Sequence, residues 1–188
     1  MGAWTSFELS ILEAIQNLSS PALDKFMVTI SSLGNASIIW IYLIIVFLST
    51  REYKTMAKIM IAAFLANILI VNLGLKNIFG RTRPYEFVPG FDLLIPPLSD
   101  GSFPSGHSSY AASFATIILV IGKSKLIKIF TSILAILMAF SRLYLYVHFP
   151  TDVIAGLIIG FLIATYTMKI YYSDEFNELR SRFNLQRK

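Results

Sequence analysis

The chain has 188 residues, of which 55% are hydrophobic and only 14% are charged, with a formal net charge of +5. This apolar fraction is above that of soluble domains and predicts a single integral membrane domain, with the lipid bilayer as partner. No cysteine is present, which excludes disulfides and thiolate metal sites, and the basic residues form no stripe of the kind that binds nucleic acid.

The N-terminal part is predicted to lie along the membrane surface. Over residues 5–18, apolar side chains recur at helical spacing among polar ones such as Glu8 and Glu13. This pattern is typical of an amphipathic interfacial helix. Residues 21–33 form a second short segment, for which an interfacial and a partly inserted position both stay open.

Five longer apolar segments follow, and a membrane span needs about 20 such residues. They cover residues 36–50, 55–79, 105–122, 125–146 and 151–172. The first is short and can recruit part of residues 21–35; if that segment crosses alone, the chain has six spans. We therefore predict an all-α, polytopic transmembrane helical bundle of five to six spans with an N-terminal interfacial helix. The single domain 1–188 divides into short or interfacial helices (1–35), a transmembrane core (36–172) and a cytoplasmic tail (173–188).

The basic residues between the segments predict the orientation of the bundle. They follow the first span, separate the third from the fourth, and end the chain: Arg51, Lys54, Lys58, Lys123, Lys125, Lys128, Arg180, Arg182, Arg187 and Lys188. With five spans these regions share one side, which the positive-inside rule makes cytoplasmic. Residues 80–104 and 147–150 then lie on the extracytoplasmic face of a bacterial-type cell membrane. The loop 85–103 is rich in Pro, Gly and apolar residues, so we expect it to rest in the interface beside a site or to form a hairpin without substrate contact.

Three cations are predicted to meet on this outer face. Lys76 ends one span, Arg83 follows seven residues later, and Arg142 stands near the outer end of another span. Guanidinium and ammonium groups gathered in one place suit a phosphate or diphosphate group. Snorkelling to lipid headgroups explains one such cation but not three beside both histidines. For Arg81 we favour snorkelling or a supporting role behind the site.

The two histidines, His107 and His148, are the only ones in the chain. Asp152 lies four residues after His148, where a carboxylate can hold one imidazole nitrogen as a donor and leave the other free to attack phosphorus. His107 follows a Pro-Ser-Gly turn at a helix start and is placed to protonate a leaving oxygen. Two histidines and an aspartate also suit zinc, but the nearby cations would repel it, so we expect no metal and no cofactor.

The three clusters resemble the K-x6-R-P, P-S-G-H and S-R-x5-H-x3-D signatures of the type-2 phosphatidic acid phosphatase superfamily. Eleven specified residues match: Lys76, Arg83, Pro84, Pro104, Ser105, Gly106, His107, Ser141, Arg142, His148 and Asp152. The resemblance implies a metal-independent lipid phosphatase in which His107 is the general acid and His148 the nucleophile. It assigns Asp152 to assist that nucleophile, and it assigns phosphate binding to Lys76, Arg83, Ser105, Gly106, Ser141 and Arg142. The superfamily also contains soluble vanadium-dependent haloperoxidases, against which the membrane composition argues.

The compact chain looks similar to undecaprenyl diphosphate phosphatases, so the favoured reaction is hydrolysis of undecaprenyl diphosphate to the monophosphate. Phosphatidylglycerophosphate, phosphatidate and lipid A phosphate are alternative substrates. A lipid phosphotransferase and a non-catalytic binder of anionic lipid are less favoured. The sequence does not indicate the oligomeric state.

Overall fold

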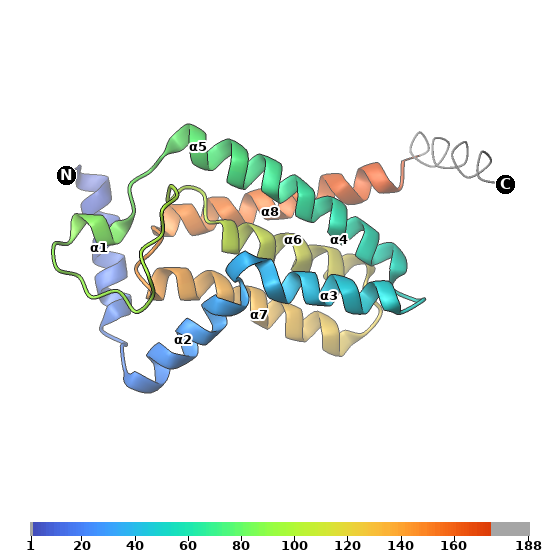
Figure 1. The fold of residues 1–188 in the computed structure, drawn as a ribbon, viewed down its shortest axis with the longest axis horizontal. Coiled ribbons are helices and arrows are strands. Elements are labelled where there is room, and N and C mark those ends of the chain that lie inside the picture. Colours follow the sequence, from blue (N-terminus) through green and yellow to red (C-terminus); the bar gives the residue numbers. More distant parts are fainter. Residues whose placement is uncertain (1, 174–188) are drawn as a thin grey trace.

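The computed structural model describes residues 2–173, apart from the side chain of Ala36, and every regular element within them is a helix (Figure 1). The predicted all-α fold is therefore confirmed, whereas the predicted cytoplasmic tail lies almost wholly outside the described residues. In chain order the elements are α1 (Ala3–Gln16), α2 (Pro21–Leu33), η1 (Asn35–Ser37), α3 (Ile38–Ser49), α4 (Lys54–Asn67), η2 (Ile68–Leu75), α5 (Lys76–Phe79), η3 (Pro84–Phe87), α6 (Gly106–Ile121), α7 (Lys125–Tyr144) and α8 (Pro150–Tyr171).

Each of the five predicted spans corresponds to helix, but not all are long enough to cross a membrane alone. Among the described residues three stretches qualify by length and hydropathy: Lys54–Phe87, α7 and α8. Helices α2 and α3 qualify only together, as a pair bent by 53° that forms either one broken span or a re-entrant segment. Helix α6 has 16 residues; it can be short because it occupies the centre of the bundle, in contact with α4, α7 and α8. The molecule is a multi-pass membrane protein.

The helix starts follow from local sequence signals. Ser105 and Ser124 cap α6 and α7, and their side-chain oxygens accept the backbone N–H of Ser108 and Ile127. Helix α8 begins at Pro150, whose missing N–H costs nothing in a first helical turn. These caps set where the helices that carry the polar clusters begin.

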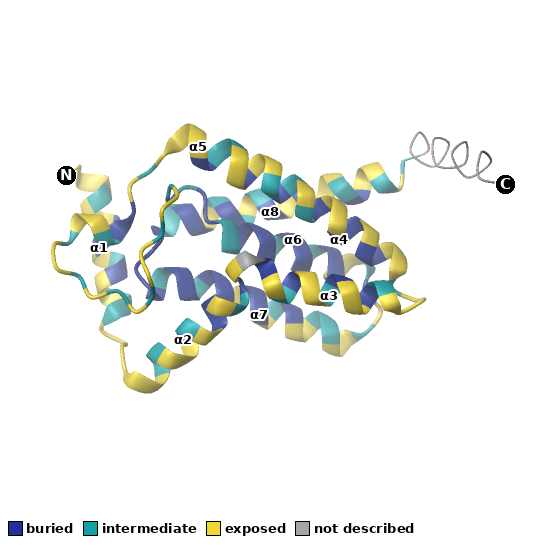
Figure 2. Ribbon diagram, in the orientation of Figure 1, coloured by how far each residue is buried: buried dark blue, intermediate teal, exposed yellow. Residues whose placement is uncertain are grey.

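Close packing of α6 against α8 forms the middle of the bundle, where buried residues concentrate (Figure 2). Gly156 and Gly160 lie against the backbone of α6, and a methyl group at either would collide with the carbonyl oxygen of Ser105 or Ser109. The predicted stripe of small residues on α8 therefore faces inward, as close helix approach in lipid requires. Large apolar side chains cover the outside of the helices, as expected for a surface in contact with lipid.

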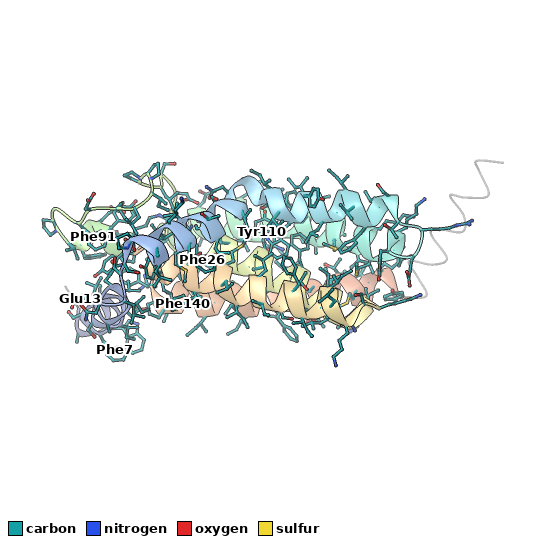
Figure 3. All side chains as sticks on the ribbon, turned by 90° about the horizontal axis from the view of Figure 1, so that it is seen from below. Phe7, Glu13, Phe26, Phe91, Tyr110 and Phe140 are labelled. Carbon is teal, nitrogen blue, oxygen red and sulfur yellow. The ribbon has the colours of Figure 1, made fainter. Side chains whose placement is uncertain are left out.

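The two ends of the bundle differ. At one end α1 lies across the other helices, as Figure 1 and the view nearly along α1 in Figure 3 both show. Its Leu9 and Leu12 pack on Tyr146 and Phe149, whereas Trp4 and Phe7 are exposed. The loop between η3 and α6 lies at this same end. The basic residues around the α3–α4 and α6–α7 connections lie at the opposite end.

Candidate active site

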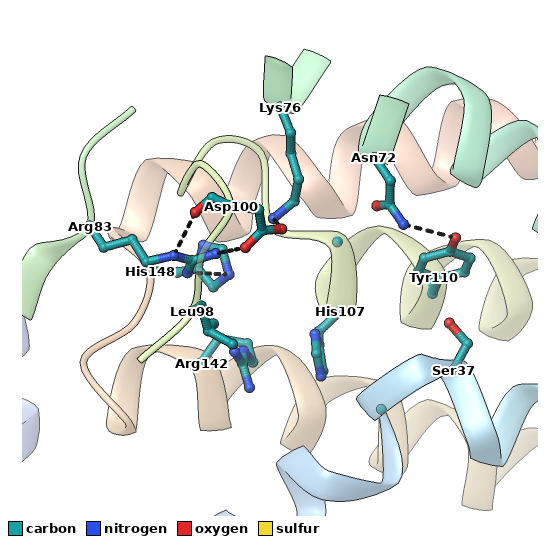
Figure 4. Close-up of a pocket in the computed structure, with 12 residues that line it drawn as sticks. Ser37, Asn72, Lys76, Arg83, Leu98, Asp100, His107, Tyr110, Arg142 and His148 are labelled. Atoms are coloured by element: carbon teal, nitrogen blue, oxygen red, sulfur yellow. Dashed lines mark hydrogen bonds and ion pairs between the residues drawn. The ribbon is translucent and has the colours of Figure 1, made fainter. Parts of the chain in front are cut away.

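A cavity of about 170 Å³ opens at the α1 end of the bundle, where the three polar clusters meet (Figure 4). Six of the nine residues that the sequence predicts for the site line this cavity: Lys76, Arg83, Gly106, His107, Arg142 and His148. They come from four separate parts of the chain: α5, the segment before η3, the start of α6, and the end of α7 with the turn that follows it. The fold thus brings together residues more than 70 positions apart in sequence.

Lys76, Arg83 and Arg142 all line this cavity, and all three side chains are buried. Lys76 follows the π-helical turns of η2, which change the helix face on which the next residues lie. Arg83 is held by the carbonyl oxygen of Val147 at 2.7 Å from Nη1. Arg142 donates from Nη1 to the hydroxyl of Ser31, while its buried Nε has no partner within the described residues. Buried cations of this kind are costly unless an anion compensates them.

Asp100, which the sequence analysis did not single out, supplies part of that compensation. Its carboxylate oxygens lie 2.6 Å from Lys76 Nζ and 2.6 Å from Arg83 Nη2. Partial burial favours the neutral carboxyl, but the hydrogen bond and charge of Lys76 and those of Arg83 outweigh it and lower the pKa of Asp100 to about 2. The carboxylate therefore stays ionised at neutral pH and occupies two of the cations that would bind a phosphate.

His148 faces these cations on one side and Asp152 on the other. Its Nε2 lies 3.4 Å from Arg83 Nη1, and its Nδ1 lies 3.6 Å from Asp152 Oδ2. Complete burial, followed by the charges of Arg83, Arg142 and Lys76, keeps the pKa of His148 well below its usual value. The ring is therefore neutral at physiological pH, with a lone pair available as a nucleophile.

Asp152 lies behind His148 and does not line the cavity. Its Oδ2 accepts the backbone N–H of Phe149 at 2.8 Å and the hydroxyl of Ser102. Its Oδ1 accepts from Arg81 at 2.5 Å. Both carboxylate oxygens are thus held in place from the α8 start, the loop before α6 and the segment after α5.

His107 occupies the second position of α6 and lies across the cavity from Arg83 (Figure 4). Its Nε2 is buried and has no hydrogen-bond partner within residues 2–173. A side chain at Gly34 would collide with the imidazole, so the α2–η1 junction closes directly over the ring. This junction therefore lies next to Nε2, the atom that has no hydrogen-bond partner.

Ser105 and Ser141 are not brought to the cavity. The Ser105 hydroxyl is bonded to that of Ser108 at 2.8 Å, and the Ser141 hydroxyl donates to the carbonyl oxygen of Met138 at 2.8 Å. The Ser105 hydroxyl is therefore engaged at the start of α6, and the Ser141 hydroxyl within the last turns of α7. Their assignment to phosphate binding stays a prediction.

The donor set around the histidines does not suit a metal ion. Within the described part of the chain, no three His, Asp or Glu side chains gather in a metal-binding arrangement. The groups that face both imidazoles include three cations. An anionic ligand fits these surroundings better than a divalent cation.

Comparison with known proteins decides the family. The model of the PAP2 superfamily matches residues 56–175, which include all three polar clusters. The chain belongs to the PAP2 superfamily. Undecaprenyl-diphosphatase from Sulfolobus acidocaldarius is 31% identical over 164 residues, which cover 87% of this chain and 78% of that relative.

Two further relatives support the same assignment. Phosphatidylglycerophosphatase B from Bacillus subtilis is 30% identical over 84% of this PAP2 chain and 80% of its own length. The crystal structure of Aquifex aeolicus LpxE superposes with a TM-score of 0.75 at 32% identity, over 86% of this chain and 94% of that one. This PAP2 protein is thus a membrane hydrolase that acts on lipid phosphates.

Proposed function

We propose that this PAP2 phosphatase hydrolyses undecaprenyl diphosphate to the monophosphate through a phosphohistidine on His148. One observation carries the proposal: neutral His148 and three buried cations line the same cavity, and Asp152 lies behind the histidine. Such an arrangement suits a phosphoryl group that is attacked in line from one side. The similarity to the Sulfolobus acidocaldarius undecaprenyl-diphosphatase supports this substrate.

In the first step, the terminal phosphoryl group displaces the Asp100 carboxylate from Lys76 and Arg83. These two cations and Arg142 then bind its oxygens and neutralise their charge. Nε2 of His148 attacks phosphorus as the bond to the bridging oxygen breaks. His107, whose protonated form is favoured by the negative charge of the bound phosphate, gives its proton to the leaving oxygen. The charge that develops on the His148 ring is stabilised by Asp152. In the second step, neutral His107 takes a proton from water, and the resulting hydroxide attacks the phosphohistidine. This step releases inorganic phosphate and restores both imidazoles.

A second cavity supports a lipid as the leaving group. It has a volume of about 560 Å³, lies between α2 and the loop before α6, and shares Leu98 and His107 with the first. Its other walls are largely apolar: Val28, Leu94, Ile95, Pro96 and Pro97, with Ser31, Ser32 and Asn35. We propose that the hydrocarbon chain leaves the phosphate cavity along this path. The predicted interfacial loop then contributes to both cavities.

Phosphatidylglycerophosphate is the second candidate substrate, because the Bacillus subtilis phosphatidylglycerophosphatase B is almost equally similar. Phosphatidate and lipid A phosphate present the same chemistry, a phosphate beside hydrocarbon. Transfer of the phosphoryl group to an acceptor other than water would use the same first step. A non-catalytic lipid binder would need the cations but not His148 and Asp152.

The first prediction concerns metal dependence and substrate choice. Purified protein in detergent and excess EDTA should release phosphate from undecaprenyl diphosphate at the rate seen without EDTA, because the proposed steps use only side chains. Phosphatidylglycerophosphate, phosphatidate and lipid A phosphate are compared at equal surface concentration by a colorimetric phosphate assay. Loss of activity in EDTA that only a divalent ion restores would refute the metal-free mechanism. If another lipid is hydrolysed faster, that lipid and not undecaprenyl diphosphate is the preferred substrate.

We also propose that the site lies on the extracytoplasmic face of a bacterial cell membrane, with residues 1–35 near that surface and 36–172 as the transmembrane core. The basic connections at the opposite end of the bundle support this orientation. The chain has no cysteine, so single cysteines can be labelled selectively. With an impermeant maleimide added to intact cells, Asp92→Cys near the site should react and Lys123→Cys should not. If only Lys123→Cys is labelled, the protein has the opposite orientation in the membrane.

A further inference from the structure

A chain of alternating charges connects α1 to the site. Glu8 of α1 is buried, and its Oε2 lies 2.6 Å from Nη2 of Arg81. The other terminal nitrogen of Arg81, Nη1, lies 2.5 Å from Oδ1 of Asp152. Asp152 in turn faces Nδ1 of His148 through its other oxygen. One guanidinium therefore bridges two buried carboxylates, of which only the second was singled out from the sequence.

The start of α8 strengthens this connection. Glu8 Oε1 accepts from the backbone N–H of Thr151 at 3.1 Å and from its hydroxyl at 2.6 Å. The same hydroxyl accepts from Arg81 Nη1 at 2.8 Å. Glu8 thus satisfies a free N–H in the first turn of the helix that carries Asp152, where a negative charge is favourable. The guanidinium of Arg81 also lies 4.1 Å over the ring of Phe149, which restricts its position further.

Arg81 is set apart from the phosphate-binding cations by its position. It does not line the cavity, and its two carboxylate partners take up both terminal nitrogens. A buried carboxyl group such as that of Asp152 is costly without a hydrogen-bonded partner of opposite charge, and Arg81 is that partner. Glu8 in turn balances Arg81, so that the guanidinium does not withdraw the carboxylate from His148.

We propose that Glu8 and Arg81 are positioning residues for hydrolysis: they hold the Asp152 carboxylate in place and oriented toward His148. Helix α1 thereby takes part in the reaction without touching the substrate. The inference rests on the proposed role of His148 as nucleophile. It assigns a function to α1 beyond membrane contact, because a shift of α1 changes the position of Glu8 and, through Arg81, that of Asp152.

The test measures hydrolysis of undecaprenyl diphosphate by E8Q, with inorganic phosphate as a competitive inhibitor. E8Q should lower kcat about 10- to 100-fold, as expected for a small misplacement of a reacting group, while KM and the inhibition constant of phosphate stay close to wild type. A merely structural role would weaken phosphate inhibition and thermal stability together with kcat. The matched control is E13Q, because Glu13 is an exposed glutamate on the same helix (Figure 3); it should keep the wild-type kcat.

A double-mutant cycle tests whether Glu8 acts through Arg81. R81Q should lower kcat at least as much as E8Q, and the E8Q/R81Q double variant should be no slower than R81Q alone, since coupled residues are non-additive. Effects that multiply, or an E8Q variant with wild-type kcat, would overturn the proposal. If E8Q does not fold, R81K takes its place, because lysine keeps the charge but cannot bridge both carboxylates. R81K should lose kcat and keep phosphate inhibition, and a wild-type kcat would overturn the proposal. Wild-type protein that hydrolyses no lipid phosphate would instead refute the proposed function.

Discussion

Replacing His148 with alanine is expected to lower the rate of phosphate release by at least about 10⁴-fold, as when the nucleophile of a catalytic triad is removed. The reason is that no other neutral imidazole in the described structure lies between the three cations and a buried carboxylate. Binding of inorganic phosphate should persist, because Lys76, Arg83 and Arg142 remain. Turnover is measured with a lipid diphosphate labelled in the terminal phosphate.

The same labelled substrate tests the intermediate directly. Rapid denaturation in alkali should trap a phosphate that is stable to base and labile to acid, as phosphohistidine is, on the wild-type protein and not on His148→Ala. Thermal unfolding of the variant, compared with wild type, controls for folding. Many turnovers by His148→Ala, or equal labelling of both proteins, would show that another group attacks phosphorus.

His107→Asn is expected to lower hydrolysis of phosphatidate, the alternative substrate whose leaving group is an alcohol, by about 10²- to 10⁴-fold, the usual contribution of a general acid. The loss should depend on the leaving group, since a good leaving group needs no proton. With 4-nitrophenyl phosphate the first step should survive while the second lacks its base. The expected signal is a stoichiometric burst of nitrophenolate followed by slow turnover, with accumulation of the phosphohistidine.

This dependence separates the two histidines. His148→Ala should lose activity toward both substrates to the same extent and show no burst, because it lacks the nucleophile in either case. An equal loss for the lipid and the aryl substrate in His107→Asn, without a burst, would contradict the assignment of His107 as acid and base. It would indicate instead that His107 only binds the phosphoryl group.

The helices and half of the twelve cavity-lining residues could be predicted because local signals encode them. Hydrophobic length, the Ser105 cap and Pro150 mark where helices begin. The short polar motifs place His107 in the first turn of α6 and His148 just before α8. The number of spans was harder to predict, because whether a short segment reaches across the bilayer depends on its neighbours. Helix α6 is short and central, and α2 joins α3 only through a bend.

Asp100 and Glu8 escaped the sequence analysis for a different reason. Each is a single acidic residue whose partners lie far away in the chain, so its role arises only from tertiary contacts. A signal for Glu8 was nevertheless present: it lies four residues before the buried Leu12, on the same face of the helix. An acid on the apolar face of an amphipathic helix predicts a buried partner, and Arg81 is that partner.

Backbone contact at Gly156 and Gly160 fixes the distance between α6 and α8 on one side of the cavity. The starts of α6 and α8, which carry His107 and Asp152, are held at a separation that leaves no room for even one added carbon. The facing side consists of the bent α2–α3 pair and the loop that holds Leu98. Substitutions on that side can change the shape of the hydrocarbon path without moving His107 or Asp152. The same arrangement of His107 and Asp152 can in this way act on lipids of very different shape.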